Sequence, residues 1–130
     1  MNRPLHRGRP EAYEGERSTA WAYVMLSREQ SRLILGRIME CQRPLKTLAV
    51  WEAVRSYTEW NTGQINVPTH TLAAAAHTTT NEVSRALSQL VELGALVRLG
   101  RGRYALNPDV AWSGTLVGRE QAASELTPAE

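Results

Sequence analysis

Residues 78–94 bring together side chains that can hydrogen-bond to another molecule. The amide of Asn81 can pair with adenine at two points, and the guanidinium of Arg85 can pair with the N7 and O6 atoms of guanine. Thr78 and Thr79 lie where a helix is expected to start, so their hydroxyl groups and the free N–H groups beside them suit a phosphate. The remaining hydroxyl residues, which can bond to nucleobases or phosphates, are Thr80, Ser84 and Ser88.

A cluster of positive charge follows this polar stretch. Arg98, Arg101 and Arg103 lie within a span of six residues. Only two acidic residues occur between residues 64 and 107, so the positive potential is concentrated locally. Such a cluster is expected to supply sequence-independent, salt-sensitive affinity for a polyanion.

Each of these residues also has a purely structural interpretation. Asn81 and Ser84 can simply be solvated, and Arg85 can pair with Glu82 or Glu92 along a helix surface. The three arginines can be edge-strand charges that block aggregation. The polar stretch and the basic cluster together favour binding to DNA over a structural role.

The polar stretch is predicted to lie on one face of a helix over residues 79–93. Thr79 and Glu82 form a capping-box pattern, in which the hydroxyl accepts one free helix N–H and the carboxylate accepts another. Gly94 is the residue type favoured just past a helix end. The opposite face is apolar at helical spacing and is predicted to pack on the core. Its residues are Val83, Leu87, Leu90 and Val91.

A β-hairpin, or wing, is predicted over residues 95–106. Its strands are residues 95–99 and 103–106, and the Gly-Arg-Gly turn at 100–102 carries Arg101 at its tip. The following Asn-Pro-Asp ends the second strand, because proline cannot continue a ladder of hydrogen bonds. A basic tip beside a polar helix can reach the flanking DNA backbone or an adjacent minor groove.

Five further elements are predicted before the polar helix. The last of them is alanine-rich, and its small side chains let another helix cross closely, as the first helix of a helix-turn-helix requires. In chain order they are a strand over residues 20–26, a helix from the Ser27 cap to Glu40, a helix over about 45–60 ended by the Asn-Thr-Gly turn, a strand over 64–67, and a helix over 72–76 capped by Thr69 or Thr71.

The order of these elements predicts the fold class. Helix, short strand, helix, turn, helix and hairpin together describe a winged helix-turn-helix, which is mainly α with a small β-hairpin wing and belongs to the α+β class. Residues 1–19 are expected to be a flexible basic arm. Residues 20–116 are expected to form the winged domain with its N-terminal extension. Residues 117–130 are expected to be an acidic polar tail with a short helix around 119–126.

Parts of the sequence resemble known families. Residues 83–87, with the Leu-Gly that ends the helix, are similar to many bacterial winged-helix regulators. Residues 102–108 and 111–114 resemble the "Tyr-x-Ile-Asn-Pro … Trp-x-Gly" ending of RepL-type plasmid replication proteins and related phage and plasmid regulators. Residues 20–26 are similar to the start of that group. The resemblance covers about residues 20–115 and implies a plasmid- or phage-associated DNA-binding protein.

Several other classes of protein are disfavoured by the composition. The single cysteine, Cys41, excludes an intramolecular disulfide and fits a reducing cytoplasm. The three histidines have no cluster of cysteines or carboxylates near them in sequence, so a metal site is not expected. No glycine-rich phosphate loop or nucleophile elbow is present, so neither an enzyme nor a cofactor is expected. No apolar run approaches the ~20 residues of a membrane span.

The sequence therefore predicts a bacterial, cytoplasmic protein, associated with the nucleoid or a plasmid, that binds double-stranded DNA. A transcriptional regulator is the first interpretation, and a plasmid replication initiator is the alternative. A homodimer on a palindromic site is expected, because the segments around the winged core exceed what that core needs. A winged-helix docking module that binds protein and not DNA is the alternative from another class, since four tryptophans could supply an apolar interface.

Overall fold

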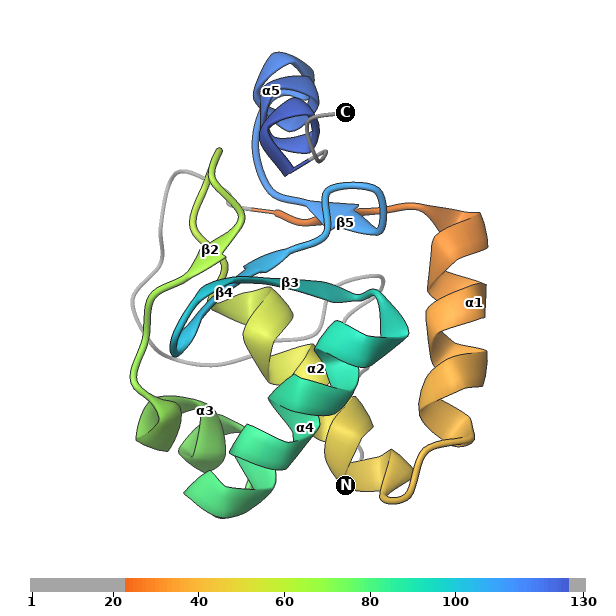
Figure 1. The fold of residues 1–130 in the computed structure, drawn as a ribbon, viewed down its shortest axis with the longest axis vertical. Coiled ribbons are helices and arrows are strands. Elements are labelled where there is room, and N and C mark those ends of the chain that lie inside the picture. The colour runs from red at the N-terminus through yellow and green to blue at the C-terminus, as the bar shows by residue number, and fades with distance from the viewer. Residues whose placement is uncertain (1–22, 127–130) are drawn as a thin grey trace, which may run out of the picture.

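The computed structural model describes residues 23–126, and the predicted arm over residues 1–19 lies outside the described residues, as do residues 20–22 and 127–130. The described part is an α+β fold with five helices and short antiparallel strands, which is compatible with the predicted mainly α fold with a hairpin (Figure 1). In chain order the elements are β1 (Met25–Leu26), α1 (Arg28–Met39), α2 (Pro44–Ser56), β2 (Gln64–Ile65), α3 (Thr69–Ala75), α4 (Thr80–Leu93), β3 (Leu96–Gly100), β4 (Arg103–Leu106), β5 (Ala111–Trp112) and α5 (Leu116–Leu126).

Helix α1 begins where the sequence predicts. The Ser27 hydroxyl accepts a hydrogen bond from the backbone N–H of Gln30 at 3.2 Å, so the first turn is capped. Ile34 and Ile38 are buried in the core. Leu35 and Met39, which follow them directly in the chain, are about half exposed. Helix α1 therefore buries only a narrow face.

Helix α2 is the centre of the fold and packs against α1, α3 and α4. It ends at Ser56, before the predicted end at about residue 60. The hydroxyl groups of Ser56 and Thr58 donate hydrogen bonds to carbonyl oxygens of the last turn, at 2.7 and 2.9 Å. Thr58 then pairs with Ile65 as an isolated β-bridge, so the chain has already left the helix and turned towards β2.

Helix α3 starts earlier than predicted, at Thr69. The predicted cap by Thr69 or Thr71 is wrong, because both residues lie inside the helix and no side chain caps it. Pro68 occupies the cap position with φ −65° and ψ 156°. Its fixed φ and extended ψ lead the chain into the first helical turn without a side-chain acceptor.

The connection between α3 and α4 is a tight turn. His77 has a left-handed backbone, with φ 56°. The N–H groups of His77 and Thr78 donate hydrogen bonds to the carbonyl oxygens of Ala74 and Ala73, at 3.3 and 2.9 Å. This is the hydrogen-bond pattern of a Schellman motif, in which glycine is the usual residue at the left-handed position.

Strands β2, β4 and β3 form an antiparallel sheet in that order. Gly100 pairs with Arg103, so it belongs to β3 and not to the turn that the sequence predicts at 100–102. The turn is therefore Arg101-Gly102, and Gly102 provides the positive φ of 70°. Strands β3 and β4 and this turn form the hairpin that the sequence predicts over residues 95–106. They are called the hairpin below.

A second, two-stranded sheet of β1 and β5 lies beside α5. Trp112 of β5 is fully buried, and its Nε1 donates a hydrogen bond to the Thr115 carbonyl at 2.9 Å, so it anchors β5 to the fold. Helix α5 covers much of the predicted tail at residues 117–130 and has no buried residue. Its Arg119 donates a hydrogen bond to the Pro108 carbonyl at 2.8 Å.

Candidate nucleic-acid interface

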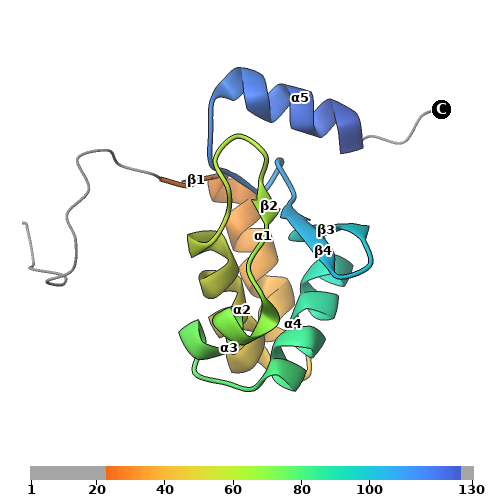
Figure 2. The ribbon, with the colours of Figure 1, turned by 90° about the vertical axis from the view of Figure 1, so that its left-hand side faces the viewer.

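Helix α4 and the hairpin lie on the same side of the molecule. In Figure 1 α4 stands in front of α2, and in Figure 2 α4 and the hairpin share one edge of the ribbon. The buried side chains of α4 are Val83, Ala86, Leu87 and Leu90, and Val91 is partly buried. All four apolar residues predicted for the core face of this helix therefore point inward, and the other face of α4 is turned to solvent.

The start of α4 is capped by a single hydrogen bond. The Thr79 hydroxyl accepts the backbone N–H of Glu82 at 3.2 Å. The second half of the predicted capping box is not formed, because the Glu82 carboxylate pairs with the Arg43 guanidinium at the start of α2. An ion pair with an arginine from another helix replaces the local bond to the backbone.

The end of α4 is held by residues from three segments. Gly94 has φ 93° and ends the helix as predicted. Arg37 of α1 donates a hydrogen bond to the Leu93 carbonyl at 2.6 Å, and the Asn107 side chain donates one to the Gly94 carbonyl at 2.8 Å. These bonds satisfy carbonyl groups that a helix end leaves free, so both ends of α4 are fixed to the fold.

Five of the predicted binding residues lie on the exposed face of α4, and their side chains make no hydrogen bond or ion pair with another residue in 23–126. Arg85 therefore does not pair with Glu82 or Glu92, as the structural interpretation of the sequence allowed. Every donor and acceptor on this face is free to bind a ligand. The five residues are Thr80, Asn81, Ser84, Arg85 and Ser88.

Thr78 differs from these five residues. Its hydroxyl oxygen is buried and has no hydrogen-bond partner among the described residues. The phosphate contact predicted for the Thr78 hydroxyl therefore does not fit this structure, because packing at the α3–α4 turn encloses the group. Thr79 is exposed, but its hydroxyl already accepts the helix N–H described above.

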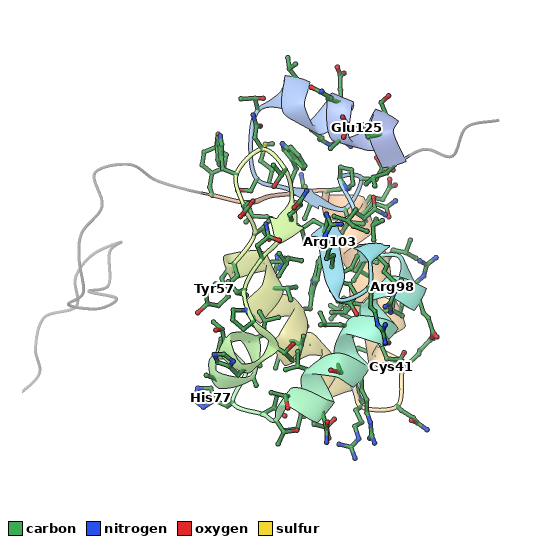
Figure 3. All side chains as sticks on the ribbon, turned by 60° about the vertical axis from the view of Figure 1, so that its left-hand side comes forward. Cys41, Tyr57, His77, Arg98, Arg103 and Glu125 are labelled. Atoms are coloured by element: carbon green, nitrogen blue, oxygen red, sulfur yellow. The ribbon has the colours of Figure 1, made fainter. Side chains whose placement is uncertain are left out.

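The three arginines predicted for the hairpin are exposed. Arg98 stacks over the Tyr104 ring, with 5.2 Å from its guanidinium carbon to the ring centroid. Figure 3 shows Arg98 and Arg103 on the hairpin and His77 at the other end of α4. Arg101 lies in the turn itself. None of the three is paired with an acid in the part of the chain that the structure describes.

The structure adds basic residues that the sequence pattern did not single out. Arg43 and Lys46, at the start of α2, line a groove of about 430 Å³ together with Glu82, Arg85 and Ser88 of α4. A sequence signal did exist, since the first turn of α2 contains a base and no acid. Such a turn is unusual, because a helix start favours negative charge.

The described residues give no sign of a metal site. In 23–126, no three His, Cys, Asp or Glu residues gather in a way that could hold a metal ion. The Cys41 thiol lies 3.5 Å from the Thr47 hydroxyl, within hydrogen-bonding reach for sulfur. Across the same residues, each helix is too short or too polar to cross a membrane.

Comparisons with models of protein families, with curated proteins and with solved structures find no match for this chain. The resemblance to RepL-type replication proteins and to winged-helix regulators therefore stays a prediction from the residues quoted for it.

Proposed function

We propose that this protein binds double-stranded DNA through a winged helix-turn-helix. The observation that carries the proposal is the exposed face of α4, where five polar side chains have no partner among the described residues. Such a face is what a helix in a major groove needs, because each base pair presents a distinct pattern of donors and acceptors there.

The arrangement of elements supports the proposal. Helix α2, strand β2, helices α3 and α4, and the hairpin follow one another in the order of a winged helix. In that fold, α4 is the recognition helix and the hairpin is the wing. Strand β3 follows α4 directly in the chain and contacts it, so the hairpin lies against α4.

The polar residues of α4 and the arginines of the hairpin have different expected roles, which follow from their chemistry. Asn81 and Arg85 can read adenine and guanine through paired hydrogen bonds, and Ser84 and Ser88 can serve bases or phosphates. The exposed arginines of the hairpin, with Arg101 at its tip, supply affinity for phosphates that does not depend on sequence. Specificity is therefore expected to follow α4, and salt-sensitive affinity is expected to follow the hairpin.

A duplex-binding titration at two salt concentrations tests the proposal. Wild-type protein is expected to bind the duplex that it selects from a mixture of sequences, with an affinity that falls steeply as the salt concentration rises. Replacing Asn81 or Arg85 with alanine is expected to cost about 1–3 kcal/mol on that site and little on random duplex. Arg28→Ala is the matched control, because Arg28 is exposed, unpaired within 23–126, and lies at the end of α1 remote from α2.

The biological role is proposed as transcriptional regulation on a plasmid or phage, with replication initiation as the alternative. The side chains of α4 suit a regulator and an initiator equally, so the two roles are distinguished by mapping the DNA sites that the protein binds. Sites in the protein's own promoter support a regulator, and sites clustered in an origin support an initiator.

A homodimer on a palindromic site is part of the proposal. It is supported by α5, which buries no residue on its own domain and exposes 67% of Leu116 and 75% of Val117. An isolated helix of this length is marginal in water, and a second copy can bury its apolar side chains. Sedimentation that shows only monomer at micromolar concentration, with and without duplex, contradicts this part.

The structure leaves fewer tryptophans for the alternative of a protein-docking module than the sequence suggests. Trp51 and Trp112 are buried in the core and cannot form an interface. Trp60 is about half exposed and meets Tyr23 edge to face, with ring centroids 5.2 Å apart. A wild-type protein that binds no duplex at low salt favours this alternative over DNA binding.

A further inference from the structure

A groove of about 430 Å³ runs between the start of α2 and the exposed face of α4. Arg43 and Lys46 line it from α2, and Arg85 and Ser88 line it from α4. The last two residues also belong to the polar face proposed to meet DNA, so the groove is continuous with that face. In Figure 1 the start of α2 lies on the other side of α4 from the turn of the hairpin.

Three cationic side chains face one carboxylate in this groove. Glu82 pairs with Arg43, which leaves Lys46 and Arg85 without an ion pair among the described residues. The cationic side chains on the two walls of the groove repel each other, and an anion bound between them attracts both. The charges of the groove therefore favour a negatively charged ligand.

The start of α2 adds a second, independent reason. Its first turn has no acid and no side-chain cap, and Lys46 lies within it. The free N–H groups of a helix start attract negative charge and disfavour a cation. Lys46 is thus unfavourable for the helix alone, and a bound anion removes that disadvantage.

We propose that this groove binds a backbone phosphate of double-stranded DNA. The inference rests on the proposed function and extends it. The hairpin arginines hold the duplex on one side of α4, and Arg43 and Lys46 hold it on the other. A duplex is the occupant because the groove opens directly onto the α4 residues, Ser84 and Ser88 among them, that are proposed to meet the same DNA.

Glu82 competes with the phosphate for Arg43. The Glu82 side chain is 18% exposed, whereas the Arg43 side chain is 52% exposed, so the arginine can turn towards a phosphate from the surface. Replacing Glu82 with glutamine removes the competing charge. Duplex affinity is expected to rise about threefold, the factor for one unit charge at about 7 Å in water.

The experiment measures duplex affinity by fluorescence anisotropy, over a series of salt concentrations, for wild type, Glu82→Gln and three further variants. Contact with one phosphate contributes about eightfold at 0.1 M salt, so Arg43→Ala with Lys46→Ala is expected to weaken every duplex about eightfold. The slope of log affinity against log salt is expected to fall by about one. The charge-preserving pair Arg43→Lys with Lys46→Arg is expected to retain the affinity and the slope, and Arg28→Ala serves as the control. Thermal unfolding of each variant confirms that it is folded.

The outcomes separate this inference from the proposed function. If wild type binds no duplex at low salt, the proposed function and the groove proposal both fall. If wild type binds and the double alanine variant binds equally well with the same salt slope, only the groove proposal falls. If inorganic phosphate shifts the amide signals of Arg43 and Lys46 while that variant keeps its duplex affinity, the groove holds a free phosphate group, and the proposal is overturned.

Discussion

Thr78 and Thr79 are neighbours whose hydroxyl groups have opposite environments. The Thr78 hydroxyl oxygen is buried and has no partner within residues 23–126. The Thr79 hydroxyl accepts the Glu82 backbone N–H at 3.2 Å and caps α4. Valine has nearly the shape of threonine but lacks the hydroxyl. Replacing each threonine with valine is therefore predicted to change the free energy of unfolding in opposite directions.

The magnitudes follow from the two environments. A buried polar group without a hydrogen bond costs about 1–3 kcal/mol, so Thr78→Val is predicted to raise the free energy of unfolding by about 1 kcal/mol or more. Loss of an N-cap hydroxyl typically costs about 1 kcal/mol, so Thr79→Val is predicted to lower it by that amount. The variants then differ by about 2 kcal/mol, which corresponds to melting temperatures roughly 8 °C apart for a domain of this size.

Urea denaturation measures both changes, with the fluorescence of the buried Trp51 and Trp112 as the signal. Thr78→Ser is the control, because it keeps the buried hydroxyl and loses only the methyl group, so it is expected to gain nothing. A Thr78→Val variant less stable than wild type refutes the reasoning. Duplex affinity is expected to be unchanged in Thr78→Val, and a tenfold loss supports instead the phosphate contact that the sequence predicts for this residue.

Three further predictions concern single side chains. His77→Gly is expected to raise the free energy of unfolding by about 0.5–1 kcal/mol, because glycine adopts the left-handed φ of 56° without Cβ strain; urea denaturation that shows a loss contradicts this. Arg37→Ala is expected to lower the free energy of unfolding by about 1 kcal/mol, because the Leu93 carbonyl loses its 2.6 Å hydrogen bond. The same variant is expected to speed amide exchange in the last turn of α4, and unchanged exchange argues that Arg37 does not hold this helix end. Arg101→Ala is expected to weaken specific and random duplexes alike, by about eightfold at 0.1 M salt, and a loss confined to one sequence would instead indicate base reading by the wing.

The features that the sequence predicted correctly depend on near neighbours in the chain. The cap at Thr79, the stop at Gly94 and the apolar side of α4 are each defined within a few residues, and the structure has all of them. The same holds for the Ser27 cap of α1 and for the hairpin. Helix ends and turns with strong side-chain signals are decided by local hydrogen bonds, so a pattern of a few residues is enough to place them.

The features that the sequence could not predict depend on tertiary packing. Arg43 meets Glu82 across 39 positions of sequence, and that pair replaces the local half of the capping box. The burial of the Thr78 hydroxyl follows from how α3 packs on α4, and no local pattern reports it. Helix α3 begins after Pro68 without a side-chain cap, so a start inferred from the threonines falls too late in the chain.

We propose that the exposed face of α4 and the hairpin form the surface that meets DNA. Amide chemical shifts measured while a selected duplex is added test it most directly. The largest changes are predicted within residues 79–93 and 96–106, with further changes at Arg43 and Lys46 and little change around Tyr23 and Trp60. Changes concentrated at Tyr23 and Trp60, or none in α4 at saturating duplex, would contradict the claim.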